Sequence, residues 1–458
     1  MIALSRRVAR RFRAAARKCS DGRTAAPPVV IHSRAGRVTL TAAYPDVTLE
    51  HDGPTHADTG SPDATLVVPM GVLDTVGGTG DDPVTFACGP KLTGTACWTE
   101  RGAERSVPVE FLLPGKQHDV LDRPKEMPGV SEGFPSALHE AARTSSREDG
   151  RYALSRVQVR GQKGQVIATD GKVAVVYSGF TFPFAEDVLV PALALFGCPE
   201  VRDEYPVRVG RTAAHLVVTL GDWTAWLAVA PAGKFPDVAA VVPRRAPTTV
   251  ALGDWDAVGL VGVLPTLPGQ GHDHRPVTLD AVGGGVLALH AADGTGARTV
   301  PCPNSPVRGA SARAVLDRRV LARALVLGCR TLHLTPGKAV AFAAPDLMVV
   351  AAPLDPTLGG DPVPVPPAAR LITPVPDPEP ELERSSAMKP HETNGTGRHD
   401  PPAETADPLT AAEELRAALV DAAAKAGRLV AALKAGRKEK KALVNLYTSL
   451  KQLNLDQP

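Results

Sequence analysis

Aromatic residues, paired cysteines and long apolar segments are all scarce in this 458-residue chain, in which only 4% of the residues are Phe, Trp or Tyr. No apolar run is long enough to cross a membrane. The six cysteines include no C-x-x-C pair, which favours buried reduced thiols in a cytoplasmic protein over a metal site or a disulfide framework. The net charge of +2 excludes a general attraction to polyanions, so any nucleic-acid surface must be local.

Signatures of the common enzyme classes are also missing from the sequence. The chain has no P-loop, no G-x-G-x-x-G after a strand and no H-E-x-x-H. The segment 129–133 matches G-x-S-x-G, but the proline-rich residues before it form no strand, so we interpret it as a loop. His272-Asp273-His274 lies in a glycine-rich loop without a partner cluster. We therefore predict a protein that is not an enzyme, with no catalytic residues, no metal and no cofactor.

Glycine (42 residues) and proline (44 residues) are abundant, which is typical of many short strands joined by turns. One such meander is centred on Asp170-Gly171, a strong two-residue turn signal. The same pattern occurs three times, because strands also end at Asp46 and Asp293, spaced by 124 and 123 residues from Asp170. Each aspartate stands alone in its copy, so we interpret all three as turn residues and not as catalytic carboxylates.

Other segments recur at the same spacing. Each copy opens with a helix, contains a strand that runs into a short helix and closes with a hairpin. The helices are expected at Ala9–Cys19, Phe134–Ser145 and Trp255–Leu264, the strand–helix segments at Thr65–Leu73, Asp187–Leu195 and Ala314–Leu325, and the hairpins at Val84–Trp98, Val207–Val229 and Thr331–Leu354. Solenoid repeats have periods of about 20–50 residues, so these longer copies are separate domains. We place them at residues 1–118, 125–246 and 247–355.

The ends of the chain differ from the three copies. Residues 356–407 are dense in Pro, Glu, Asp and Thr and cannot bury enough apolar surface to fold, which predicts a disordered linker. Leucines then recur at helical spacing, which predicts a helical tail over residues 408–458. Near the start, seven basic residues between Arg6 and Lys18 lack an apolar signal core. This favours a basic helix of the first domain over a transit peptide.

Basic residues gather on the segments that we expect to be helical. They are Arg10, Arg13, Arg17, Arg143, Arg147, Arg318, Arg319 and Arg323. Two interpretations have equal weight: a solvated helix face, or contacts to the phosphates of a duplex, which need no base readout. Basic loop residues also recur, at Arg23, Arg151 and Arg275, with the same two interpretations.

Three motifs of the second copy resemble those of a known family. They are Gly150-Arg151-Tyr152-Ala153-Leu154, Ala168-Thr169-Asp170-Gly171 and Gly233-Lys234-Phe235-Pro236-Asp237, the last closing on Val241-Val242-Pro243. Their order and spacing are similar to those of the second domain of the bacterial beta sliding clamp of DNA polymerase III. The first and third copies match more loosely, and the resemblance covers about residues 5–354.

The resemblance implies an α+β fold of three clamp-type domains per chain, with sheets outside and helices lining the lumen of a ring. Two chains would close this ring head to tail as a homodimer. The implied function is that of a DNA sliding clamp, a processivity factor that encircles double-stranded DNA and tethers the replicative polymerase, with a clamp loader as a further partner and no membrane. Arg23, Arg151 and Tyr152 match loop positions at which the family contacts DNA.

The resemblance also implies a pocket between the second and third domains for a short client peptide with apolar anchors. Position by position, its lining would be Leu154, Thr169, Gly171, Lys172, Val173, Ala174, Pro243, Pro247, Val350, Pro353 and Leu354. The family usually has His-Arg-Leu where this chain has Lys172-Val173-Ala174, and Met-Pro where it has Ala352-Pro353. We therefore expect a smaller and less apolar pocket.

The tail lies outside the family pattern, and its partner is unknown. Its residues Gln452–Leu455 resemble the front of a clamp-binding peptide but lack the aromatic residue, and the end of an amphipathic helix is the simpler interpretation. Two functions stay open. One is a sliding clamp, and the other is a clamp-derived interaction or scaffold protein whose helical tail recruits other partners.

Overall fold

The computed structural model describes residues 1–20, 22, 24–54, 63–113, 121–146, 153–230, 235–243 and 245–361. All of them belong to one compact unit, Met1–Pro374. The predicted linker and tail at residues 356–407 and 408–458 lie outside the described residues, apart from 356–361. Within the described ranges, no helix has the length and apolar character needed to span a membrane.

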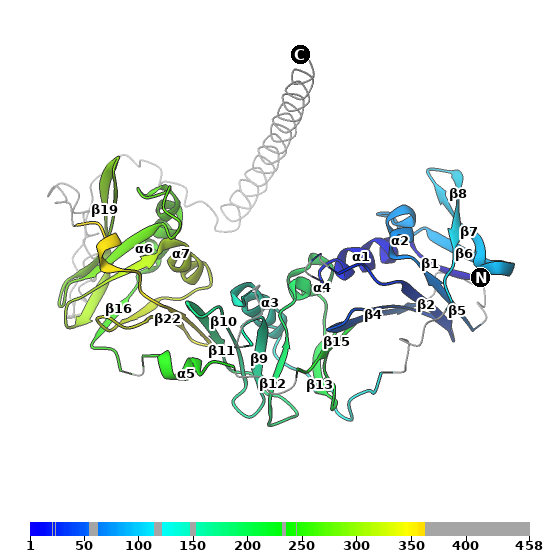
Figure 1. Ribbon diagram of the computed structural model, residues 1–458, viewed down its shortest axis with the longest axis horizontal. Helices are drawn as coiled ribbons and strands as arrows, with labels where there is room; N and C mark the ends of the chain where they lie inside the picture. Colours follow the sequence, from blue (N-terminus) through cyan, green and yellow to red (C-terminus); the bar gives the residue numbers. More distant parts are fainter. Residues whose placement is uncertain are drawn as a thin grey trace, which may run out of the picture. The chain divides into compact units, whose positions relative to one another are not determined.

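One order of elements occurs three times along the chain (Figure 1). The first copy consists of β1 (Ile2–Ser5), α1 (Arg6–Ala16), β2 (Val29–Arg34), β3 (Arg37–Ala43), β4 (Val47–Pro54), β5 (Ala64–Val68), α2 (Met70–Val76), β6 (Pro83–Cys88), η1 (Pro90–Leu92), β7 (Thr93–Glu100) and β8 (Ala103–Glu110). The second consists of α3 (Phe134–Thr144), β9 (Arg156–Arg160), β10 (Gln165–Thr169), β11 (Val173–Tyr177), β12 (Asp187–Pro191), η3 (Ala194–Gly197), α4 (Pro199–Arg202), β13 (Val207–Arg211), β14 (His215–Leu220) and β15 (Trp223–Ala228).

The third copy follows a short connecting helix, α5 (Val238–Val241). It consists of β16 (Thr248–Ala251), α6 (Asp254–Val263), η4 (Leu264–Thr266), β17 (Pro276–Ala281), β18 (Val286–Asp293), β19 (Gly296–Gly309), β20 (Ala312–Asp317), α7 (Arg318–Val326), β21 (Thr331–Leu334), β22 (Val340–Ala344) and β23 (Leu347–Ala351), and η5 (Pro356–Leu358) comes last. The internal repeat predicted from the sequence is thus confirmed. The second copy has no counterpart of β1 and β16 among its described residues, and an isolated bridge between Gly129 and Arg208 lies there instead.

Two details of the prediction were wrong. Each copy closes with three strands and not with a hairpin, because Arg101-Gly102 and its counterparts form further two-residue turns; both residues of that turn have positive φ. The strand-into-helix segment of the second copy also continues as a 3-10 helix, η3, before α4. Pro199 explains the break, since the residue before a proline is driven to extended geometry, and Cys198 has ψ 126°.

Asp170 and Asp293 have the structural role at their turns that the sequence predicts, whereas the Asp46 carboxylate forms an ion pair with Arg156 (3.2 Å). Asp170 accepts hydrogen bonds from the backbone N–H groups of Lys172 (2.8 Å) and Val173 (2.7 Å). Asp293 accepts one from the N–H of Thr295 (2.8 Å). These are side-chain-to-backbone bonds of the kind that makes Asp a turn former. The expectation for the cysteines holds only in part, because Cys88 and Cys97 are exposed while the other four are buried.

Antiparallel backbone pairing joins the three copies. The strands form a four-stranded sheet (β1-β6-β7-β8), a seven-stranded sheet (β13-β14-β15-β4-β3-β2-β5) and a twelve-stranded sheet (β12-β9-β10-β11-β23-β22-β21-β16-β19-β18-β17-β20). The first joint pairs β15 with β4, and the second pairs β23 with β11. Both joints therefore pair the last strand of one copy with the third strand after the opening helix of the copy before it.

Two strands that correspond to the strands of the internal joints keep one side without a partner strand among the described residues. β8 is the end strand of the four-stranded sheet, and β19 pairs with β18 on one side only along Gly296–Cys302. By position in the repeat, β8 is the counterpart of β15 and β23, and β19 is the counterpart of β4 and β11. The first copy therefore has a joint strand, β8, and the third copy has another, β19, and neither is paired in the manner of the two internal joints.

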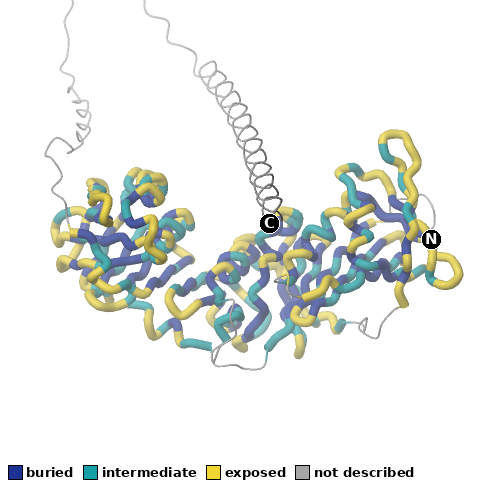
Figure 2. Tube along the Cα trace, turned by 45° about the horizontal axis from the view of Figure 1, so that its top comes forward, coloured by how far each residue is buried: buried dark blue, intermediate teal, exposed yellow. Residues whose placement is uncertain are grey.

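Buried residues occur on the strands and helices of all three copies (Figure 2). Several of the few aromatic residues are fully buried. The fully buried Phe12 of α1 stacks on Trp223 of β15, with ring centroids 6.1 Å apart. The guanidinium of Arg11 lies over the Trp223 ring, 5.8 Å from its centroid. This contact joins the first copy to the second next to the β4–β15 joint.

Truncation of this aromatic contact should destabilise the protein strongly. We expect Phe12→Ala to lower the free energy of unfolding by about 3–5 kcal/mol, because it leaves a cavity against Trp223. Urea unfolding followed by tryptophan fluorescence measures the change. Val258→Ala is the control, since Val258 is 67% exposed. Equal effects of the two substitutions would show that the stacked pair is not a core contact.

Candidate functional site

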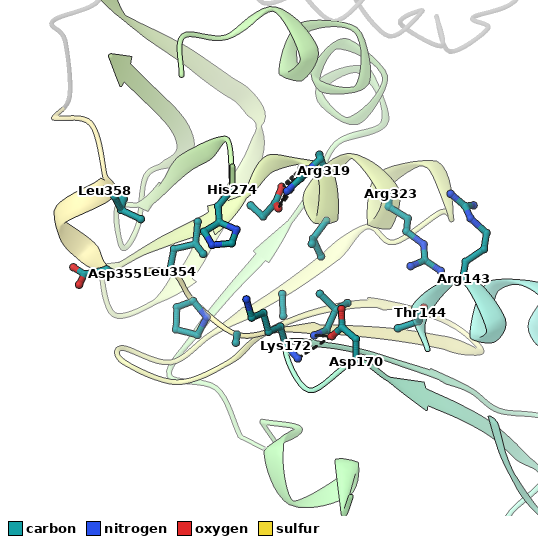
Figure 3. A pocket seen from close by; sticks show the side chains of 16 residues that line it. Arg143, Thr144, Asp170, Lys172, His274, Arg319, Arg323, Leu354, Asp355 and Leu358 are labelled. Atoms are coloured by element: carbon teal, nitrogen blue, oxygen red, sulfur yellow. Dashed lines mark hydrogen bonds and ion pairs between the residues drawn. The ribbon is translucent and has the colours of Figure 1, made fainter. Parts of the chain in front are cut away.

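A cleft of about 840 Å³ lies between the second and third copies (Figure 3). One part of its lining is apolar, and the other is rich in cations. The apolar residues are Val173, Val320, Ala351, Ala352, Pro353, Leu354 and Leu358, and the basic residues are Arg143, Lys172, His274, Arg319 and Arg323. Lys172 and His274 lie near Leu354 at one end, and Arg143 and Arg323 lie near Thr144 at the other. Such a surface fits an extended ligand that is partly apolar and partly anionic.

The β11–β23 joint builds the floor of the cleft. Val173 is the first residue of β11 and lies opposite Ala351, the last residue of β23. The chain after β23 stays in place because the N–H of Ala352 donates to the Lys172 carbonyl (2.8 Å) and that of Leu354 to the Val315 carbonyl (2.7 Å). Backbone pairing therefore holds the apolar residues at the ends of these two strands beside each other.

The loop that carries His274 is held by a buried arginine. Arg318 is only 2% exposed, and its guanidinium donates to the carbonyls of Leu267 (2.7 Å), Arg275 (2.8 Å) and Pro276 (3.0 Å). Burial lowers the pKa of this group from its ordinary value. The interpretation of Arg318 as part of a basic helix face was wrong, because its guanidinium is buried inside the third copy and binds backbone carbonyls there. The sequence pattern gave no sign of this, since the carbonyls come from a loop about 50 residues earlier.

The acidic residues in the cleft are already engaged. Asp317 caps α7 and forms an ion pair with Arg319 (2.6 Å). Asp355 accepts hydrogen bonds from the N–H and hydroxyl of Thr357, and the backbone bond is the main cause of its lowered pKa. Asp170 is bound by the two N–H groups of its own turn. Lys172, by contrast, has no ion-pair partner among the residues that the structure describes, so the cleft keeps an excess of positive charge.

Glu140 of α3 connects the cationic end of the cleft to α7. Arg323 donates from Nη2 (2.7 Å) and Nε (3.0 Å) to one carboxylate oxygen, and Arg143 donates to the other (2.8 Å). Burial of Glu140 acts to raise its pKa, but the hydrogen bonds and charges of Arg323 and Arg143 outweigh it, and the pKa lies below its ordinary 4.5. One carboxylate shared by two arginines leaves one net positive charge at this point.

The residues predicted for a client pocket fall into separate groups. Lys172, Val173, Pro353 and Leu354 line the cleft. Next to it, the Thr169 hydroxyl accepts from the Gly171 N–H (3.0 Å) and donates to the Val173 carbonyl (2.8 Å). Leu154 lies beside Gly171, within about 4.0 Å of where a Cβ atom would stand on that glycine.

Other predicted pocket residues lie on the opposite face of the sheet. Ala174 and Val350 pair across the β11–β23 joint and pack with Ile167, Val238 and Ala341 in a small apolar cluster. A second cavity, of about 290 Å³, adjoins this cluster at Ile167. Pro243 and Pro247 line neither cavity. Side chains alternate between the two faces of a strand, so residues that are adjacent in the motif separate in space.

The basic residues of α1 are mostly paired with carboxylates. Arg13 and Arg17 share Asp74 of α2, at 3.0 Å and 2.8 Å. Arg11 forms an ion pair with Glu204 across the joint to the second copy. Arg10 is exposed and, within the part of the chain that the structure describes, donates to the Gly78 carbonyl (3.2 Å). The Arg13–Asp74–Arg17 group thus repeats the two-to-one arrangement found around Glu140.

Four of the predicted DNA contacts, Arg23, Arg147, Arg151 and Tyr152, lie outside the described residues. Arg275 is exposed, and its side chain has no ion-pair partner within the described ranges. The rings of His272 and His274 are 5.9 Å apart. No group of three or more potential metal ligands occurs among the residues that the structure describes. The role of His274 in the cleft was missed because its loop reads as solvated until the topology brings β23 beside it.

Comparison with known proteins gives matches in structure but not in sequence. No protein-family model matches the chain, and no curated protein matches it. A putative DNA polymerase III beta subunit from Eubacterium rectale matches with a TM-score of 0.64 at 13% identity, covering 78% of this chain and 99% of its own. The DNA polymerase III subunit beta from Pseudomonas aeruginosa matches with a TM-score of 0.62 at 16% identity, covering 77% and 99%. A DNA polymerase sliding clamp from Bacillus subtilis gives 0.64 at 12% identity, covering 77% and 98%.

Loss of the shared carboxylate should destabilise the cleft in a pH-dependent way. We expect Glu140→Gln to lower the free energy of unfolding at pH 7 by about 2–3 kcal/mol, because two charge-assisted contacts are lost. The folded-state pKa is depressed below 4.5, so this contribution is present above pH 4.5 and disappears as the pH falls through the folded-state pKa. Urea unfolding at pH 7 and pH 3.5 measures both values. A pH-independent difference between variant and wild type would contradict this, and Glu132→Gln, at an exposed position, is the control.

Proposed function

The chain has the fold of the bacterial beta sliding clamp, and from this premise we propose that it is a DNA sliding clamp. Two copies would close head to tail into a ring around double-stranded DNA. The ring would tether the replicative polymerase as a processivity factor in the cytoplasm, after placement on DNA by a clamp loader. It would perform no chemistry of its own.

The observation that carries this proposal is the pair of incomplete joints. Two joints of one kind connect the three copies, and β8 and β19 are the halves of a third. Exposed strand edges tend to find partner strands. A heterologous contact between two different surfaces forms a closed ring when the rotation between copies permits it. A second copy that offers β8 to β19, and β19 to β8, satisfies all four edges at once.

The charge distribution on the helices supports contact with a duplex backbone. The Arg13–Asp74–Arg17 and Arg143–Glu140–Arg323 groups each leave one net positive charge on helices of different copies. Arg10 and Arg275 add further exposed cations, whereas Arg319 is paired with Asp317. Partly compensated arginines suit a ring that must slide, because they attract phosphates in a salt-dependent way without reading bases.

We further propose that the cleft takes the client peptide. Its apolar end at Leu354 would hold the anchors of the peptide, and Lys172 and His274 would pair with carboxylate groups of the client. The apolar cluster around Ala174 and Val350 on the other face of the sheet is already filled by Val238. The binding surface would therefore be more polar than the full set of predicted residues implies.

The basic residues of the cleft also support a second candidate function. A clamp-derived interaction or scaffold protein would keep the three clamp-type domains but no longer encircle DNA or tether the polymerase. The presence of five basic side chains in the cleft favours it, and its partners would then be recruited through residues 408–458. The two functions differ in one outcome, since only a clamp stays linked to closed circular DNA.

Topological retention tests the clamp function. We expect the protein, loaded onto nicked circular plasmid, to stay bound at about 0.5 M salt and to be lost when the plasmid is linearised, since screening removes phosphate contacts but not linkage. Gel filtration of the complexes with a radioactive or fluorescent protein measures both states. Equal loss from circles and linear molecules would refute the clamp function.

A variant pair separates linkage from electrostatic binding. Arg13→Ala/Arg17→Ala should weaken low-salt binding to short linear duplexes and lower the salt dependence of that binding, with retention on circles kept. Lys163→Ala, at an exposed turn of the second copy, should change neither property.

Client binding is tested at the apolar end of the cleft. We expect Leu354→Ala to weaken binding of the fluorescent peptide Gln-Leu-Asn-Leu-Phe by about tenfold, because an apolar anchor loses its contact. Fluorescence anisotropy measures the affinity. Leu113→Ala is the control, since Leu113 is 73% exposed in the first copy. Unchanged affinity in the Leu354 variant would place the client elsewhere.

A further inference from the structure

The two internal joints share one register. In the first, Val47 to His51 lie opposite Leu227 to Trp223, and in the second, Val173 to Tyr177 lie opposite Ala351 to Leu347. In each joint, the first residue of β4 or β11 lies opposite the fifth residue of β15 or β23. Both joints contain five residue pairs, and both are antiparallel.

The same rule applied to the two unpartnered edges gives a definite register. The first residue of β19 is Gly296, and the fifth residue of β8 is Val107. Backbone directions agree with this pairing. The two-residue turn at Arg101-Gly102 makes Ala103 face β7, so the N–H groups of alternate residues, including Ser106, point to the unpaired side. The same alternation after the β18–β19 turn directs Ala297 outward.

Both internal joints are extended at each end by one more backbone hydrogen bond. At one end, the N–H of Ala228 donates to the Asp46 carbonyl (2.9 Å), and the N–H of Ala352 donates to the Lys172 carbonyl (2.8 Å). In both cases the donor, Ala228 or Ala352, directly follows the last paired residue of its strand, Leu227 of β15 or Ala351 of β23. Its counterpart on β8 is Pro108, which has no N–H to donate.

The other end of the joint shows the same difference. The N–H of Asp52 donates to the Asp222 carbonyl, and the N–H of Ser178 donates to the Asp346 carbonyl, both at 2.9 Å. The counterpart of these two donors on β19 is Pro301. Both flanking hydrogen bonds found in each internal joint are therefore absent from a third joint of the same register.

The centre of the joint differs as well. The central pairs of the internal joints are apolar, Leu49 with Ala225 and Val175 with Val349. Their counterparts on β19 and β8 are Arg298 and Arg105. Among the described residues, Arg105 has a distant contact to Glu100 (3.9 Å), and Arg298 donates to the Thr266 hydroxyl (3.3 Å). Like charges directly opposite each other destabilise a strand pair.

We propose that β8 pairs with β19 of a second copy in the register of the internal joints, Val107 opposite Gly296 and Arg105 opposite Arg298. Pro108 and Pro301 end this ladder, and the facing arginines weaken its centre. The joint between copies is thus built weaker than the two joints within a chain. The inference rests on the proposed ring.

Disulfide cross-linking tests the register. In a Cys88→Ser/Cys97→Ser background, which removes the exposed thiols, we expect Ser106→Cys/Ala297→Cys to give a covalent dimer on a denaturing gel after mild oxidation. Residues directly opposite in a ladder have Cα atoms about 4.5–5.5 Å apart, within disulfide range. Ser106→Cys/Pro301→Cys is the matched control, since its thiols would stand four residues out of register. Cross-linking of the control pair alone would overturn the proposed register.

Restoring the missing donors tests the weak joint. We expect Pro108→Ala/Pro301→Ala to tighten dimerisation by roughly tenfold or more, because each new N–H can form a backbone hydrogen bond worth about 0.5–1.5 kcal/mol. Arg298→Leu, which copies the apolar centre of the internal joints, should tighten it further. Sedimentation equilibrium over a dilution series measures the dimer dissociation constant. Pro303→Ala, at an exposed position of the same strand outside the ladder, should leave it unchanged.

The outcomes separate this inference from the proposed function. Dimers that stay linked to circular DNA but do not tighten in the Pro108→Ala/Pro301→Ala variant would overturn the weak joint and leave the clamp intact. A wild type and variants that all remain monomeric would contradict both. Thermal unfolding of each variant at low concentration shows whether the fold is kept, since all four substituted side chains are exposed.

Discussion

Antiparallel pairing between strands of different copies is the constraint on which the rest of the structure depends. The β4–β15 and β11–β23 joints fix the copies to one another by backbone hydrogen bonds, in one register. The second joint also aligns Val173 with Ala351 and so creates the floor of the cleft. Because each joint uses one strand from each of two copies, a chain of three copies leaves two such strands, β8 and β19, without their joint partner. These two strands are the observation that supports the proposed ring.

Charge is distributed in a second recurring arrangement. Arginines outnumber the carboxylates that hold them, as around Asp74 and Glu140, so the helices keep a moderate positive charge while each guanidinium stays oriented. Full neutralisation would remove the attraction to phosphates, and isolated arginines would lose their fixed positions. The near-zero net charge of the chain is compatible with DNA contact for this reason, since the excess is local.

Much of the fold could be predicted from the sequence, because repeated short-range signals specify it. The turn aspartates at 46, 170 and 293 and the three opening helices follow from local propensity and spacing. The site could be predicted only in part. Arg318 looks like a surface cation until the loop carbonyls it binds are placed around it, and His274 reaches the cleft only through tertiary structure. Lys172, Val173 and Ala174 are adjacent in the motif, yet strand alternation sends Ala174 to the other face.

The most direct test of the central claim is an image of the protein on DNA. Electron cryomicroscopy of the chain incubated with a clamp loader and a primed circular template should show two copies in a closed ring, with the duplex passing through the lumen and β8 of each copy beside β19 of the other. A single copy on the outside of the duplex, or a dimer joined through other surfaces, would contradict the account.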